Sequence, residues 1–262
     1  MKGTIAAVVA LSAVLAGQAP PQFEVASVKP NASGDGKVLI QPQPGGRFTA
    51  MNVTLRQLIR YAYQLQESRI TGGPAWLARD HFDIVAKAER AGMDDRLMLR
   101  ALLAERFKLV VHTDTRELSI YALVLAKSDG APGPELKQSA PDCEAPSADN
   151  RSACGVKVLP GTILAGGATL TELADGLSTL VDRVVQDRTG LTAHFAFTLR
   201  WTPEQVSPGY ERKARAMGLP PIDPDGPAVF TAAREQLGLK LDAQKGPVSV
   251  LVVDRAELPK ED

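Results

Sequence analysis

The chain is short of the residues that usually build metal and nucleophilic sites. It has two cysteines and three histidines, and aromatic residues make up only 5% of its 262 positions. Basic and acidic residues number 30 each, so no net field draws the chain toward nucleic acid or acidic lipid. The sequence therefore disfavours nucleic-acid binding and predicts neither a metal site nor a cofactor.

Long apolar runs are also scarce. The one candidate follows Lys2 and extends from Ile5 to Leu15, which is too short to cross a bilayer comfortably and is typical of an export signal. We expect residues 1–19 to be a signal peptide that is removed, which would leave no stable membrane span and a periplasmic or secreted protein. The alternative is an uncleaved membrane anchor.

The two cysteines lie in one polar loop. Cys143 and Cys154 are separated by ten residues, most of them small or polar. In an oxidising compartment this arrangement predicts a local disulfide. A metal site is disfavoured because the spacing is not C-x-x-C and no histidine lies nearby.

Two stretches of the chain align with each other without a gap. Gly46 to Val85 falls on Gly161 to Arg200 at an offset of 115, which pairs Thr54 with Thr169 and Phe82 with Phe197. A second match at an offset of 130 places Glu105 to Val111 on Glu235 to Leu241. We interpret the chain as a duplicated module.

Each copy predicts the same order of elements. Thr54 and Thr169 are expected to cap helices, because apolar residues follow each of them at helical spacing. Second helices are predicted over 94–106 and 230–237. The expected fold class is α+β, with two related modules, each strand, helix, strands, helix and hairpin, and small antiparallel or mixed sheets. The predicted division is 20–127 for the opening strand and first module, 128–160 for a Pro/Gly/Ser-rich linker, and 161–262 for the second module with an insertion at 203–227.

The closing part of each copy predicts a hairpin. Residues 107–112 and 120–126 are expected to pair around a polar turn, and so are 239–241 and 248–253. The apolar strands 120–126 and 248–253 should lie inside a sheet. Edge positions are expected for the short strands 47–51 and 162–165, which would leave their backbone groups available to a partner strand.

Several segments, taken in order, resemble one protein family. They are FEVASVKPN from Phe23, TLRQLIRYAYQL from Thr54, ITGGPAWL from Ile70, and VVQDRTGLTAHFAFTLRWTP from Val184. The chain is similar to an exported paralogous family of soil bacteria whose shared region is a domain of unknown function. Related regions occur as extracytoplasmic tails of antibiotic-sensor-type membrane metallopeptidases. The resemblance implies no catalytic residue, and the chain has no H-E-x-x-H motif that would carry over proteolysis.

Two groups of residues are candidates for a site. His112 and Asp114 could move a proton or bind a cation, which would make the protein an extracytoplasmic hydrolase. Arg60, Tyr63 and Trp76 could instead form a binding face, since such residues are enriched in interfaces. We favour an exported, non-enzymatic binding or interaction protein, whose partner would be a periplasmic or cell-envelope protein or peptide. The hydrolase is the alternative.

Overall fold

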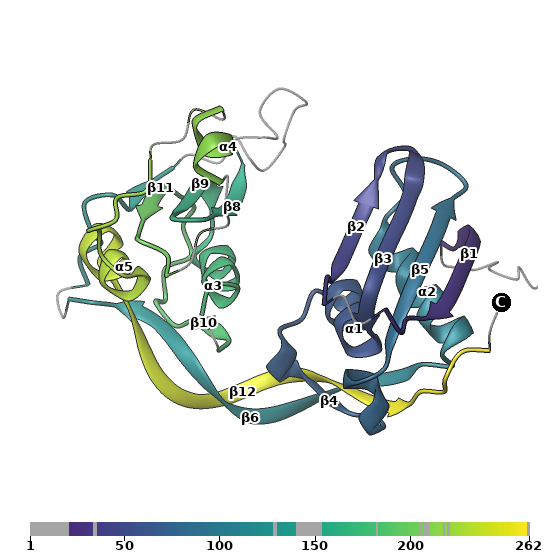
Figure 1. Ribbon diagram of the computed structural model, residues 1–262. Coiled ribbons are helices and arrows are strands. Elements are labelled where there is room, and N and C mark those ends of the chain that lie inside the picture. Colours follow the sequence, from purple (N-terminus) through teal and green to yellow (C-terminus); the bar gives the residue numbers. More distant parts are fainter. Residues whose placement is uncertain are drawn as a thin grey trace, which may run out of the picture. The chain divides into compact units, whose positions relative to one another are not determined.

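The protein has an α+β fold with three small four-stranded sheets, antiparallel and mixed (Figure 1). The structure, a computed structural model, describes residues 21–33, 36–127, 130–139, 154–181, 183–204, 206, 210–216, 218 and 221–260. The chain divides into two compact units. Unit 1 takes its described residues from Met1–Leu65, Gly72–His112 and Val253–Asp262, and unit 2 from Gln66–Thr71 and Thr113–Val252.

Unit 1 is built on an antiparallel sheet in the order β1-β5-β3-β2. The strands are β1 (Phe23–Pro30), β2 (Leu39–Gln43), β3 (Arg47–Thr54) and β5 (His81–Ala88), with the turn η1 (Pro44–Gly46) between β2 and β3. Exposure alternates along these strands. Phe48, Phe82 and Ile84 are buried on one face, whereas Met51 and Val85 are exposed on the other. One face of the sheet therefore forms the core of unit 1.

Helices supply the rest of that core. The helix α1 (Leu55–Tyr63) packs against α2 (Asp95–Arg106) and against the short turn η3 (Ala75–Ala78). Thr54 caps α1 as predicted: its hydroxyl accepts the Gln57 N–H, and the Gln57 side chain accepts the Thr54 N–H. The α1 residues spaced at helical intervals are all buried, namely Leu55, Leu58, Ile59 and Ala62.

Unit 2 has its own sheet, in the order β7-β11-β9-β8. Its strands are β7 (Lys137–Gln138), β8 (Gly155–Leu159), β9 (Thr162–Ala168) and β11 (Phe195–Arg200). The helices are α3 (Leu170–Ser178), α4 (Tyr210–Ala216) and α5 (Val229–Leu237). Thr169 caps α3 with the same reciprocal box that Thr54 makes. The core of unit 2 joins α3, α5 and the sheet through buried apolar side chains such as Leu173, Leu177, Phe197, Trp201 and Leu237.

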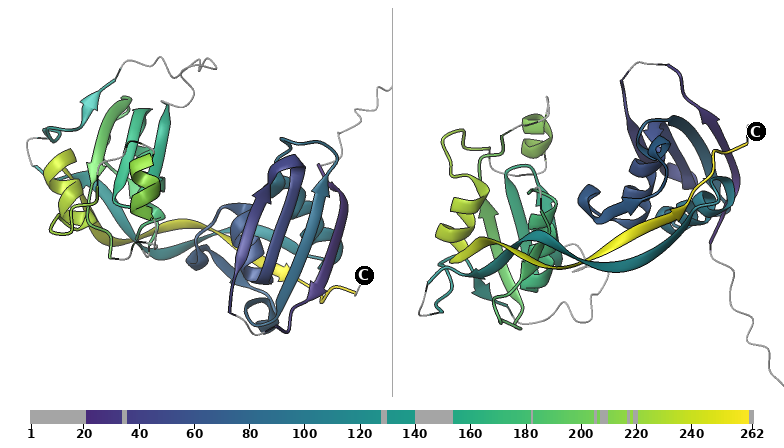
Figure 2. Two further views of the ribbon diagram at one scale, coloured as in Figure 1. Left: turned by 45° about the horizontal axis from the view of Figure 1, so that its top comes forward. Right: turned by 90° about the horizontal axis from the view of Figure 1, so that it is seen from below.

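The third sheet has the order β10-β6-β12-β4, in which the long strands β6 (Val110–Leu125) and β12 (Leu239–Arg255) are central. The short strands β4 (Ile70–Gly72) and β10 (Val185–Asp187) flank them, and β4 follows the turn η2 (Glu67–Arg69). Figure 2 shows β6 and β12 running side by side. Each long strand contributes residues to both units. The prediction that residues 120–126 and 248–253 lie inside a sheet is confirmed for 120–125 and 248–253.

The two predicted hairpins are wrong. Residues 107–126 contain one continuous strand from Val110, and residues 239–253 lie in a single strand that continues to Arg255. The two-residue turns that hairpins favour need a residue with positive φ, and neither β6 nor β12 contains one, Gly246 included. The polar residues that resembled turns are exposed strand residues instead.

The predicted edge strands are also misplaced. Strand β3 lies between β5 and β2, and β9 lies between β11 and β8, so both are central. Their outer neighbours, β2 and β8, are the true edges, together with β1 and β7. Strand β2 contains Pro42, which lacks a backbone donor and suits an edge.

Two further predictions concern the signal peptide, with no membrane span after it, and the disulfide. No helix within the described residues is long and apolar enough to span a membrane. Residues 1–19, the predicted signal peptide, lie outside the described residues. Cys154, just before β8, is disulfide-bonded. Cys143 lies outside the described residues, so its pairing with Cys154 stays a prediction.

Candidate functional site

The predicted binding residues all belong to unit 1. Arg60 and Tyr63 lie on α1, and Trp76 lies in η3. Arg60 is exposed, whereas Tyr63 is half-buried beneath the Arg100 guanidinium, 4.5 Å from its ring centroid. Burial raises the pKa of the Tyr63 hydroxyl. Tyr63 therefore has a structural contact of its own, and its role in binding stays a prediction.

Trp76 has an intramolecular packing role. Its ring centroid lies 6.3 Å from that of Phe82 and 6.5 Å from that of Phe107, and both of these phenylalanines are buried. The Trp76 side chain itself is half-buried. One part of the indole thus contacts the core, and only the remainder is available for a partner.

His112 and Asp114, the predicted site of the alternative hydrolase, each have another partner in the structure. His112 Nδ1 lies 2.9 Å from both carboxylate oxygens of Asp254, far away in the sequence. Asp114 accepts hydrogen bonds from the Thr115 N–H and from Nε of Arg116. Residues two apart on a strand share a face, so the local spacing suggested Asp114 as a partner for His112, but it could not reveal a carboxylate on the neighbouring strand β12. Within the described residues, no group of three or more His, Cys, Asp or Glu side chains could hold a metal ion.

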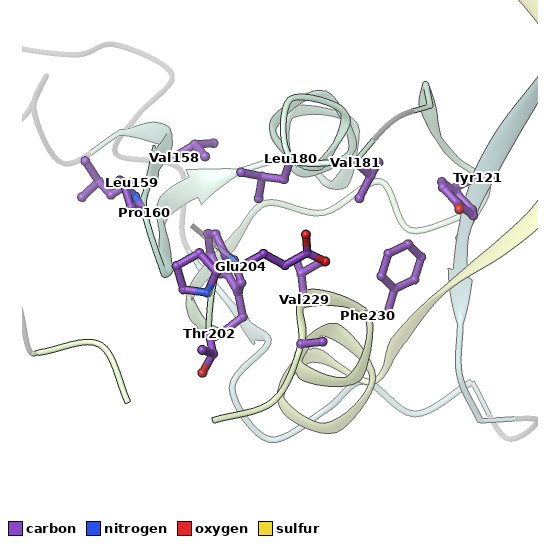
Figure 3. Close-up of a pocket in the computed structure, with 13 residues that line it drawn as sticks. Tyr121, Val158, Leu159, Pro160, Leu180, Val181, Thr202, Glu204, Val229 and Phe230 are labelled. Carbon is purple, nitrogen blue, oxygen red and sulfur yellow. The ribbon is translucent and has the colours of Figure 1, made fainter. Parts of the chain in front are cut away.

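A cavity of about 640 Å³ lies in unit 2, on residues that the sequence did not single out (Figure 3). Its volume is within the range of small-molecule sites. Its lining comes from β6, the end of β8, the segment after α3, the segment after β11, and the start of α5. The lining residues are Tyr121, Val158, Leu159, Pro160, Leu180, Val181, Trp201, Thr202, Pro203, Glu204, Ala228, Val229 and Phe230.

Aromatic side chains form one side of the cavity. The rings of Tyr121 and Phe230 meet edge to face, with centroids 5.2 Å apart. The Arg183 guanidinium lies 5.0 Å from the Tyr121 ring centroid. Phe230 remains 39% exposed, so part of its ring is accessible from the cavity. The indole of Trp201 is almost fully buried and forms part of the wall.

Hydrogen bonds to backbone carbonyls hold the other wall of the cavity in place. The Thr202 N–H donates to the Pro227 carbonyl, 2.9 Å away, and the Thr202 hydroxyl donates to the Asp223 carbonyl. The Tyr210 hydroxyl donates to the Pro160 carbonyl at 3.0 Å. These bonds hold the segment after β11 against the segment that leads into α5. The cavity is therefore bounded by hydrogen-bonded backbone.

Glu204 supplies the charge at this site. It is the one charged residue among those that line the cavity, and it is exposed. Figure 3 shows its side chain extending from the segment after Thr202 toward the rings of Tyr121 and Phe230. An aromatic, largely apolar chamber with a single carboxylate can hold an organic ligand and orient it through one polar group.

These features define the class of the chain: an α+β protein with a small-molecule-sized apolar cavity in unit 2. The family follows from comparison with known proteins. A family model described as a protein of unknown function, DUF3738, matches residues 56–256, and the chain belongs to this family. Neither a curated protein nor a solved structure is significantly similar to it.

Proposed function

We propose that the protein is an exported, non-enzymatic binding protein whose ligand site is the cavity of unit 2. The cavity itself is the observation that carries the proposal, because it combines an apolar and aromatic lining with one convergent carboxylate. The cavity is open to solvent at Glu204 and Phe230, so a ligand can reach it. The proposed location is the periplasm or the medium, in line with the resemblance to exported proteins.

The proposal includes an origin by duplication of one α+β module. The capping boxes of Thr54 and Thr169 begin helices of nine residues each. Asn52 in β3 has a φ of 54°, and Gly167 in β9 has a φ of 56°, each at an irregularity in strand pairing. Asn52 and Gly167 are related by the same offset as the two threonines. Positive φ is rare at a non-glycine residue such as Asn52, and a similar backbone conformation at the matched Gly167 supports common descent.

The second helices of the two modules differ at their starts. Both are followed by a residue with left-handed φ, Lys108 after α2 and Gly238 after α5. However, α2 has 12 residues and α5 only nine, because α5 lacks the first turn of α2. Pro227 disfavours a helical conformation in the residue before it and accounts for the late start.

The missing turn explains the cavity. In unit 1 the first turn of α2 carries Met98, which is 2% exposed and fills the core. The matching position in unit 2 is Ala228, which lines the cavity with far fewer atoms. The space at this position is thus filled by a side chain in unit 1 and left open in unit 2. Divergence of this kind supports a binding role that belongs to unit 2.

A neutral ligand tests the proposal. We expect 4-phenylbutanol to bind wild-type protein with a dissociation constant of about 1 mM or tighter, from the usual energy per ligand atom. Its binding should change the emission of Trp201, which lines the cavity. Replacing Val229 by Phe fills the space and should weaken binding at least about tenfold, an effect near 1.4 kcal/mol.

The control variant is Val85→Phe, which adds the same atoms on the open face of the unit 1 sheet, where Val85 is 59% exposed. Calorimetric titration should give the wild-type affinity for this variant. Equal affinity of the Val229→Phe variant and the wild type would place the ligand elsewhere and remove the basis of the proposal.

A further inference from the structure

We infer that the cavity of unit 2 selects a small organic cation, a ligand with an aromatic or apolar body and an ammonium group that pairs with Glu204. The inference rests on the proposed function, since it names the ligand class of the same cavity. It follows from three features of the described residues: an unpaired carboxylate, an accessible aromatic pair, and the balance of charge around them.

The carboxylate of Glu204 is unengaged. Within the described part of the chain, no hydrogen bond or ion pair joins Glu204 to another group. Its neighbours in the lining are almost all apolar, so no other side chain of the cavity competes for its charge. A carboxylate beside a partly desolvated chamber gains more from a bound cation than one in open water, because the local dielectric is lower. Glu204 therefore favours a positively charged ligand group.

The aromatic pair is suited to the same ligand. Tyr121 already accepts the guanidinium of Arg183 over its ring, so this part of unit 2 holds a cation against an aromatic face. Phe230 is in contact with Tyr121 and remains partly exposed. An ammonium group between Glu204 and the Phe230 ring would meet both a carboxylate and an aromatic face, while the ligand body would cover the apolar lining.

Two positively charged groups near the cavity favour an anionic ligand instead. The start of α5 has no side-chain cap, so its free N–H groups carry about half a positive charge and favour an anion. Arg183 is a full positive charge near Tyr121, but it is not a lining residue and is already placed on the ring. The full charge of Glu204 outweighs the fractional charge of the helix start. An anionic ligand is the direct competitor in the test.

The test uses three ligands with one common body, 4-phenylbutylamine, 4-phenylbutanol and 4-phenylbutanoate, titrated calorimetrically into the full-length mature protein at pH 7. We expect the amine to bind about tenfold tighter than the alcohol and the carboxylate to bind weakest. In the Glu204→Gln variant the amine should lose this preference while the affinity for the alcohol is unchanged. The preference should also shrink at high salt, because part of the site is open to solvent.

Glu235→Gln is the matched control, since Glu235 is an exposed glutamate of α5 that does not line the cavity. It should keep the wild-type preference. Equal binding of amine and alcohol, tighter binding of the carboxylate, or a preference that survives Glu204→Gln would overturn the inference while leaving the cavity as a binding site. Failure of all three ligands to bind would overturn the proposed function and this inference together. If Glu204→Gln lowers the melting temperature and leaves ligand preference intact, Glu204 serves only the start of α5.

Discussion

Tyr61 is the residue of unit 1 whose protonation is most strongly tied to its surroundings. Burial, followed by the hydrogen bond to Asp95 and the charge of that carboxylate, raises the pKa of Tyr61 to about 12. The Tyr61 hydroxyl donates to Asp95 Oδ2 at 2.5 Å, which joins α1 to the first turn of α2. The Arg96 guanidinium, 5.9 Å from the ring centroid, acts in the opposite direction without cancelling the shift.

The raised pKa predicts a loss of stability in alkaline solution. The folded protein holds the Tyr61 proton more tightly than the unfolded chain, whose tyrosines titrate near pH 10, so the stabilisation is complete below pH 10 and is lost as pH rises toward 12. Tyr61→Phe should cost about 1 kcal/mol at pH 7, the usual value of one hydrogen bond, and should flatten the pH dependence. Urea unfolding from pH 8 to 11.5 measures both. A variant with the wild-type alkaline slope would contradict the assignment.

Residues whose partners are close in sequence were the most predictable. The caps at Thr54 and Thr169 depend on a side chain three positions away, so they were predicted and are confirmed. His112 depends on Asp254, which is 142 positions away, and no local pattern reveals that contact.

At the scale of elements, the helices α1, α2, α3 and α5 followed their patterns, whereas α4, the short strands β7 and β8, and the two long strands did not. Exposed polar residues in the middle of β6 and β12 were interpreted as turns. The exposed residues of a strand and the residues of a turn are both mostly polar. Only the backbone conformation distinguishes the two. Strand β3 was misassigned to an edge because its outer neighbour is β2. Strand β2 has few apolar residues, so little in the sequence indicated this pairing.

The end of α5 gives a prediction about backbone approach. Gly238 and Gly36 have nearly the same positive φ, +66° and +68°, but a Cβ on Gly238 would meet the Gly133 nitrogen at 2.4 Å, while one on Gly36 would meet nothing. Gly36→Ala should cost roughly 1–2 kcal/mol from conformation alone. Gly238→Ala should cost a further 1–3 kcal/mol or so, since backbone atoms must move. Chemical denaturation of both variants gives the difference, and equal losses would show that the close approach is easily relieved.

At the scale of the whole molecule, the cavity could not be predicted from the sequence. Its lining comes from five separate segments, and residues such as Tyr121, Glu204 and Phe230 form no motif. The sequence pattern assigned Tyr121 to a strand and Glu204 to an insertion, but it assigned Leu159 to the linker 128–160, although Gly155–Leu159 form β8. The sequence pattern predicted a short helix over 230–237, but not the open space beside the start of α5.

Partner binding by unit 1 remains a separate prediction. Replacing Arg60 and Tyr63 together by Ala should abolish capture of a cell-envelope partner, because both residues lie on the surface of α1. Loss of the Tyr63 contact with Arg100 should cost about 1 kcal/mol, so the melting temperature should fall by only a few degrees. Cross-linking of the periplasmic fraction followed by affinity purification measures capture. The variant Arg90→Ala, at an exposed arginine outside this face, and the melting temperature serve as controls, and undiminished capture would assign Arg60 and Tyr63 to the scaffold.

The path of the chain has a consequence for biosynthesis. Unit 1 includes the last segment of the protein, from Val253 onward, and the Glu257 N–H donates to the Phe107 carbonyl at 2.7 Å. A ribosome therefore makes all of unit 2 before it supplies the residues from Val253 onward that belong to unit 1. During synthesis the residues of unit 2 are complete while unit 1 still lacks the contact between Glu257 and Phe107.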